Sequence, residues 1–473
     1  MNKKNNKKNE LLKNTILIFL GKVSTQFLSF FLLPLYTSYL TSGEYGYIDL
    51  IITYISLFVP LVTLQQEMAV FRFLIDNRNN EKMVKKIISN SLLIIFKIIM
   101  IFIPLFLLVI LYFNVKYKYL IILNIIICIF CNFFLQVARG LGKNLTYSIA
   151  SFIGGALTIV SNIILIIFCH CGSISLLISM AFSNSVLIIY LIVFLKIYNY
   201  ISFSLKDKNL SKDLLKYSIP LIPNSISWWI INVSDRTIIS LFLGVSSNGI
   251  YAVSCKFPSI VSSLFSIFNL SWSESASLHI KDDDSTEFFS SIFNSALKFF
   301  SCLSILIISF LPLIYSIIIG NNFSESYNYI PILIIGALFS CIVGIYSAIY
   351  IALKLTKKVA MTSIYSAIIN IVINLALIKF IGLYAACIST LLSYLIMSII
   401  RYIDIKKYIK IRINIKNIVF IVALFIISIF SYYSNNVIIN ILSLIFIIIC
   451  CLILNYDFIK SIFLKLRNIA KIL

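Results

Sequence analysis

The sequence predicts an all-α integral membrane protein of about fourteen transmembrane helices. Three observations support this prediction: 60% of the 473 residues are hydrophobic, only 12% are charged, and the mean hydropathy is +1.02. A soluble globular chain contains about 45–50% apolar and about 25% charged residues. Because a protein core cannot bury such an excess, much of the apolar surface must face lipid. The composition therefore excludes a disordered chain, a secreted disulfide scaffold and a soluble enzyme.

Apolar runs bounded by polar breaks mark the predicted transmembrane helices, each long enough to cross a hydrocarbon core of about 30 Å. The first run follows a basic N-terminus, but it is too long for a signal peptide and lacks a small-residue cleavage site, so we expect it to remain as a helix. The predicted helices lie at 15–36, 48–70, 87–113, 119–138, 146–169, 174–195, 217–243, 250–273, 291–319, 329–353, 359–379, 383–400, 417–434 and 437–455.

The net charge of +22 indicates how the chain is oriented. With the N-terminus inside, the outside loops contain only Lys116, Lys118 and Lys379. The inside segments then carry about ten times as many Lys and Arg residues, as the positive-inside rule requires. We therefore expect both chain ends to be cytoplasmic, and we attribute the basic charge to this rule and not to a nucleic-acid partner.

The chain also shows a weak internal repeat. Leu40–Gly46 follows the first predicted helix and Leu243–Gly249 follows the seventh, and both are Leu-x5-Gly loops. An offset of six helices predicts two parallel six-helix bundles around a central cavity, followed by a terminal helix pair. The expected organisation is a cytoplasmic N-terminus (1–14), a first bundle (15–200), a linker (201–216), a second bundle (217–410), and the terminal pair with its tail (411–473).

Polar residues form one face of the second predicted helix. Asp49, Thr53, Ser56, Pro60, Thr63 and Glu67 recur at spacings of three and four residues. Such spacing places them on one side of an α-helix, where they line a cavity or hold helices together through hydroxyl hydrogen bonds. Helix contacts explain Glu67 less well, because a charge at the bilayer centre costs at least about 2.5 kcal/mol.

A similar face is predicted on the seventh helix, where Asn224, Trp228, Asn232 and Arg236 recur every four residues beside Asp235. Two lysines also fall within apolar helices: Lys22 in the first, and Lys256 in the eighth, where its neighbours in sequence are uncharged. Three alternatives to ligand binding stay open: Asp235 and Arg236 neutralise each other, Lys22 extends to the membrane interface, or Lys256 does so.

Several cations in one cavity predict an anionic ligand, because Arg binds phosphate through a bidentate fork and Lys binds it as a point charge. Glu67 and Asp235 are candidates for binding a coupling proton or sodium ion, or they balance the cations. The ten cysteines lie mostly inside apolar runs. The pair Cys128–Cys131 has no accompanying second pair, so no metal or cofactor is predicted.

Several strings resemble the bacterial oligosaccharide-lipid flippases, the polysaccharide transporters of the multidrug/oligosaccharidyl-lipid/polysaccharide exporter superfamily. The resemblance extends over about residues 10 to 410 and depends on the order of many matches and not on one diagnostic motif. The matching strings are Phe31–Thr37 with Leu40–Gly46, Ala69–Phe73, Pro220–Asn224 with Ser234–Arg236, Gly249–Tyr251, Ser271–Ala276 and Tyr329–Leu333.

The resemblance implies a flippase of the bacterial cell membrane. Its substrate would be a polyprenyl-pyrophosphate-linked oligosaccharide, moved from the cytoplasmic to the outer leaflet for surface polysaccharides such as O-antigen or capsule. Polysaccharide polymerases and glycosyltransferases would be its functional neighbours. The matching strings carry over Arg72, Asp235 and Arg236, whereas Lys22 and Lys256 depend on the argument from charge. Together, Arg72, Lys22, Arg236 and Lys256 are expected to hold the pyrophosphate.

Alternatives remain at this point. A multidrug exporter of the same superfamily is disfavoured because the cations within the predicted helices equal or outnumber the acids. A lipid II flippase is harder to separate by sequence. A membrane glycosyltransferase or glycan polymerase belongs to a different class and usually has a long outer loop with catalytic acids. Here the acidic run Asp282–Asp284 falls in a predicted cytoplasmic loop, which favours a transporter over an enzyme.

Overall fold

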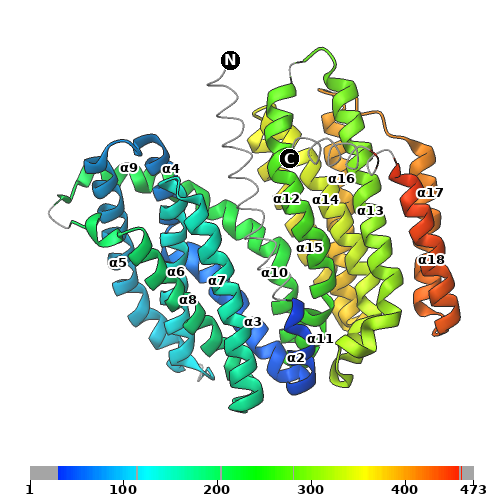
Figure 1. Ribbon diagram of the computed structural model, residues 1–473, viewed down its shortest axis with the longest axis horizontal. Coiled ribbons are helices and arrows are strands. Elements are labelled where there is room, and N and C mark those ends of the chain that lie inside the picture. Colours follow the sequence, from blue (N-terminus) through cyan, green and yellow to red (C-terminus); the bar gives the residue numbers. More distant parts are fainter. Residues whose placement is uncertain (1–29, 113–114, 203–204, 281, 457–459, 461–473) are drawn as a thin grey trace, which may run out of the picture. The chain divides into compact units, whose positions relative to one another are not determined.

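The computed structural model describes the chain apart from residues 1–29, 113–114, 203–204, 281, 457–459 and 461–473 (Figure 1). Every regular element in the described part is a helix. The chain divides into two compact units, Met1–Val233 and Ser234–Leu473, and the boundary falls inside helix α10 (Ile222–Phe242).

Eleven described helices are long and apolar enough to cross a membrane. The number rises to twelve if the bent pair α11 (Val245–Ser254) and α12 (Lys256–His279) forms one span. Each predicted span after the first coincides with a described helix or helix pair, and the all-α integral membrane class is confirmed. The predicted first span, 15–36, falls mostly outside the described residues.

The first unit contains the helices up to the start of α10. Local sequence signals explain two of the helix starts: Thr41 and Glu44 form a capping box at α3, and Asp207 caps α9 by accepting from the backbone N–H groups of Asn209 and Leu210. The helices are α2 (Leu33–Tyr39), α3 (Ser42–Val62), α4 (Gln66–Asn77), α5 (Glu81–Tyr112), α6 (Lys118–Gly140), α7 (Asn144–Ile163), α8 (Ile174–Phe194) and α9 (Lys208–Ser218).

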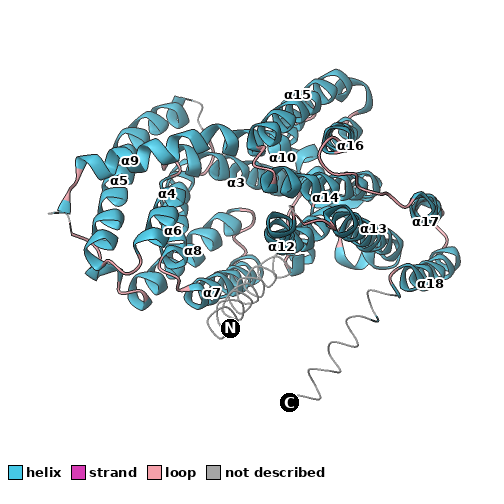
Figure 2. Ribbon diagram, turned by 90° about the horizontal axis from the view of Figure 1, so that it is seen from above, coloured by secondary structure: helices cyan, strands magenta, loops and turns pink. Residues whose placement is uncertain are grey.

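The second unit packs around an apolar core to which α12, α13 and α14 contribute Val261, Phe293 and Tyr346 among others. The terminal helices α17 and α18 pack on α13 through Ile421, Ile447 and Ile305 (Figure 2). Besides α11 and α12, the helices of this unit are α13 (Ser285–Ile318), α14 (Ile330–Ala352), α15 (Thr356–Ile381), α16 (Leu383–Ile405), α17 (Ile415–Tyr433) and α18 (Val437–Leu454).

The predicted span 48–70 differs from the structure in one respect. It is not one continuous helix, because a turn at Thr63–Gln65 separates α3 from α4. Pro60 removes a backbone donor from the last turn of α3. Leu64 and Gln65 then adopt left-handed backbone angles, with φ of 49° and 59°. The polar face predicted from Asp49 to Glu67 is therefore interrupted before it reaches Glu67.

Candidate functional site

A buried carboxylate in the second unit is surrounded by polar side chains from three other helices. Asp235 of α10 is 3% exposed. Its Oδ1 accepts a hydrogen bond from Asn374 Nδ2 of α15 at 2.8 Å. Its Oδ2 accepts from Thr390 Oγ1 of α16 at 2.7 Å and from the Tyr251 hydroxyl of α11 at 3.0 Å. Neutral donors from α11, α15 and α16 therefore surround this carboxyl group inside a membrane protein.

The polar cluster around Asp235 contains an acceptor atom that is not used by its neighbours. Arg236, the next residue on α10, interacts electrostatically with its carboxylate. Asn374 Oδ1 is buried and has no hydrogen-bond partner among the described residues. Asn370 extends the cluster by donating to Thr390 Oγ1 at 3.3 Å. A carboxylate beside an unused amide oxygen can bind a proton or a monovalent cation.

Sequence reasoning selected Asp235 but did not assign a role to its partners Tyr251, Asn374 and Thr390. One signal was present, because Asn370 and Asn374 lie one helical turn apart within a predicted membrane-spanning helix. Which of the other helices supplies the remaining donors depends on packing and cannot be read from spacing. The described residues contain no group of three or more His, Cys, Asp or Glu that could hold a metal ion.

The predicted basic residues lie in different environments. Arg236 and Lys256 are half-buried on α10 and α12 in the second unit. Arg72 lies on α4 in the first unit, where it is exposed and pairs with Asp76 at 2.8 Å. Lys22 falls outside the described residues. The helix α10 contains Asn224, Trp228 and Asn232, but their side chains also lie outside the described part.

The second predicted acid, Glu67, is 7% exposed in the first turn of α4. Its Oε2 has no hydrogen-bond partner among the described residues. The structure describes Glu67 and Asp235 in different units, Glu67 in the first and Asp235 in the second.

A buried arginine that sequence reasoning placed in a cytoplasmic segment lies within α16. Arg401 is fully buried, and its guanidinium donates to Thr362 Oγ1 at 3.0 Å, to the Val343 carbonyl at 3.1 Å and to Ser363 Oγ at 3.2 Å. It also donates to Ser347 Oγ and to the Val359 carbonyl. Hydroxyl and carbonyl groups therefore solvate this cation and connect α14, α15 and α16.

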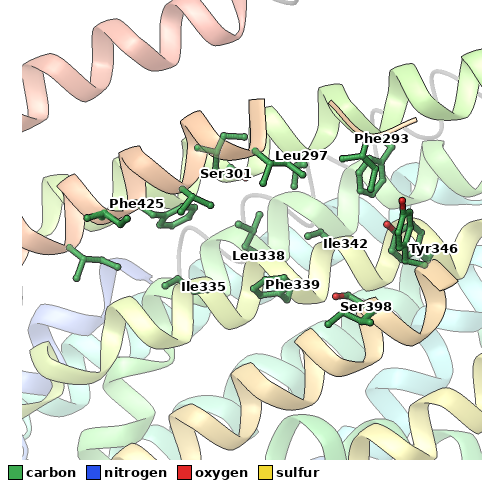
Figure 3. A pocket seen from close by; sticks show the side chains of 18 residues that line it. Phe293, Leu297, Ser301, Ile335, Leu338, Phe339, Ile342, Tyr346, Ser398 and Phe425 are labelled. Carbon is green, nitrogen blue, oxygen red and sulfur yellow. The ribbon is translucent and has the colours of Figure 1, made fainter. Parts of the chain in front are cut away.

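An apolar groove of about 500 Å³ lies in the second unit among α13, α14, α16 and α17 (Figure 3). Leu297, Leu338 and Phe425 line it with other apolar side chains. Ser301, Ser398, Tyr346 and Tyr402 are its polar lining residues. The groove therefore suits a hydrocarbon chain and offers nothing to a charged ligand.

Comparisons with known proteins identify the family and the fold. The family model described as polysaccharide biosynthesis protein matches residues 11–273, which is more than half of the chain. No curated protein matches the sequence. Several solved structures have a similar fold. The "Lipid II flippase MurJ, inward closed conformation" has 17% identity and a TM-score of 0.69 over 95% of this chain and 100% of that chain. An inward-facing multidrug resistance MATE family transporter of the MOP superfamily has 14% identity and a TM-score of 0.68 over 84% and 95%.

Proposed function

Because the chain belongs to the polysaccharide biosynthesis protein family and has the fold of MOP-superfamily transporters, we propose that it is a flippase for polyprenyl-pyrophosphate-linked oligosaccharides. It moves the sugar unit from the cytoplasmic to the outer leaflet of the bacterial cell membrane, with both chain ends in the cytoplasm. Glycosyltransferases supply this substrate and a polysaccharide polymerase uses the product.

The observation that carries this proposal is the half-burial of Arg236 on α10 and Lys256 on α12, two helices that the sequence predicts to span the membrane. A charged side chain at the bilayer centre costs at least about 2.5 kcal/mol, so a cation that is kept within a membrane helix usually serves a ligand. A pyrophosphate provides oxygens for the guanidinium fork and for the ammonium group. Arg72 and Lys22, predicted from the sequence, remain further candidates for binding the head group. Transport then follows alternating access, in which inward-open and outward-open states exchange.

The lipid part of the substrate requires an apolar environment along the protein. The groove among α13, α14, α16 and α17 supports this requirement, because its lining is almost entirely hydrocarbon. In the proposed mechanism, the prenyl chain remains in the lipid phase and lies against this groove while the head group crosses.

Ion coupling is assigned to Asp235. Its carboxylate accepts from Thr390, Asn374 and Tyr251, and the oxygen of Asn374 is available as a further ligand for Na⁺ or for a protonated carboxyl group. An Asp235→Asn variant keeps the shape of the site and removes its charge. Transport by this variant should no longer respond to an ion gradient, and an unchanged response would exclude Asp235 as the coupling group.

Glycan delivery in cells tests the proposed function. The double variant R236Q/K256Q removes both half-buried charges and should abolish surface glycan while the protein stays in the membrane. Full delivery by this variant would contradict the proposal. Two further outcomes identify the alternatives: rescue of peptidoglycan synthesis in cells depleted of their own lipid II flippase favours a lipid II substrate, and export of a cationic dye favours a multidrug transporter.

A further inference from the structure

Two cysteine thiols meet in the second unit, between helices that are far apart in the sequence. Cys302 of α13 is 4% exposed and Cys451 of α18 is 6% exposed. Both belong to the apolar cluster through which the terminal helices pack on α13 (Figure 2). The thiol of Cys451 donates a hydrogen bond to the sulfur of Cys302. The two sulfur atoms are therefore direct neighbours across the contact between α13 and α18.

An amide from the end of α18 reaches the same place. Asn455 follows the last turn of α18 and is half-buried, and its side-chain nitrogen donates to Cys302 Sγ at 3.2 Å. The same nitrogen donates to the Cys451 backbone carbonyl at 3.1 Å, which fixes its position. Cys302 Sγ therefore accepts two hydrogen bonds beside a cluster whose other members include Ile305 and Ile447.

These contacts favour one reaction of a thiol pair, the formation of a disulfide. Donors that point at a sulfur atom stabilise its thiolate form, which is the nucleophile in this reaction. The neighbouring thiol supplies the second half of the bond, because a disulfide forms between cysteines whose side chains already meet. A cysteine that only fills space in a core needs neither the donors nor the second thiol.

We propose that Cys302 and Cys451 form a reversible disulfide between α13 and α18 when the protein meets a peroxide. The Cys302 thiolate attacks one oxygen of hydrogen peroxide and becomes a sulfenic acid. The O–O bond breaks, and the second oxygen leaves as water after it takes up the proton that the thiol released. The Cys451 thiol then attacks the oxidised sulfur, and the S–O bond breaks with loss of a second water. Two thiols are oxidised to one disulfide, and one peroxide is reduced to two waters.

Such a bond acts on the walls of the apolar groove. The crosslink fixes α18 to α13, and α17 packs on both of these helices. Helices α13 and α17 line the groove through residues such as Leu297 and Phe425. The oxidised protein therefore holds these two walls together by a covalent bond, whereas packing alone holds them in the reduced protein. This inference goes beyond the flippase proposal and does not depend on it.

The experiment cuts the chain between the two cysteines and asks whether the pieces stay joined. A protease site is inserted after Lys407, in the exposed stretch between α16 and α17 of the full-length protein. The piece that follows the cut contains two cysteines, Cys450 and Cys451. The protein in detergent is treated with hydrogen peroxide, its remaining thiols are blocked with N-ethylmaleimide, and the chain is cut. The two pieces should migrate together on a denaturing gel, and dithiothreitol should separate them.

Matched variants identify the two sulfur atoms. C302S and C451S should each abolish the joined band, whereas C450S removes the neighbouring thiol and should leave the band unchanged. C341S removes another buried cysteine of the same unit, on α14, and should also leave it unchanged. Asn455→Leu removes the amide donor and should slow the formation of the bond roughly ten-fold, as expected for the loss of one hydrogen bond to a charged group.

Peptide mass spectrometry of the oxidised native chain tests the same bond without any substitution, so it does not depend on the folding of the variants. It should find two peptides joined through Cys302 and Cys451. Three results would overturn the proposal: pieces that never join, a joined band that survives in C302S or C451S, or peptides joined through Cys450 instead. Failure of the flippase proposal is read separately, from glycan delivery.

Discussion

The side-chain amide of Asn374 donates to the Asp235 carboxylate across 2.8 Å and so connects α15 to α10 within the second unit. Both residues are buried. Replacing Asn374 with leucine removes a hydrogen bond to a charged group, so the free energy of unfolding should fall by about 1.5–3 kcal/mol. The unfolding midpoint in detergent checks this loss. Ser389→Ala removes only a local bond to the Ala386 carbonyl and should cost less; equal losses would contradict the importance of Asn374.

Arg401 should not tolerate substitution by lysine. Arg401→Lys keeps the buried charge but loses the planar fork that reaches α14 and α15 together. The expected loss is about 2–4 kcal/mol in the free energy of unfolding. Lys358→Met is the matched control on α15, since it removes a partly exposed ion pair with Asp404 and should cost much less. An Arg401→Lys protein as stable as the native one would show that the hydrogen bonds of Arg401 contribute nothing to the free energy of unfolding.

Filling the apolar groove should affect long lipid chains selectively. Ile342 is half-buried and lines the groove on α14, and Ile342→Trp places an indole in it. Delivery of a substrate with a full-length prenyl chain should fall, whereas a short-chain analogue should still be moved. Ile351→Trp, on the exposed side of the same helix, should change neither. Equal transport of both substrates by Ile342→Trp would exclude the groove from lipid binding.

The stability of the α9 cap should depend on pH. The backbone N–H of Leu210, with Lys86 at 3.1 Å, holds the pKa of Asp207 below its ordinary value. Because the folded-state pKa is the lower one, the carboxylate stabilises the fold above the unfolded value of about 3.9, and this contribution is lost as the pH falls through the folded value. Asp207→Asn keeps a capping oxygen without the charge. The difference in unfolding midpoint between native and variant proteins should therefore become smaller below about pH 4. A difference that does not change with pH would show that the Asp207 charge does not stabilise the cap.

Composition and periodicity were sufficient to predict the fold class and every described span after the first. They also selected Asp235 and Glu67, because a carboxylate inside an apolar segment can be recognised from the sequence alone. They did not reveal the partners of Asp235, since Tyr251 and Thr390 reach it only after α11 and α16 pack beside α10. Nor did they predict that Arg401 is buried, because an arginine near a helix end resembles a loop cation until its hydrogen bonds are known. The break before Glu67 was missed because the 3.6-residue spacing continues across it.

The most direct measurement is glycan movement by the purified protein in liposomes that contain a polyprenyl-pyrophosphate-linked oligosaccharide, followed by a lectin that cannot cross the bilayer. A flippase predicts that the lectin gains access to sugars that began on the protected leaflet, and that R236Q/K256Q abolishes this gain. Access at the same rate in protein-free liposomes, or in those with the double variant, would contradict the proposed function.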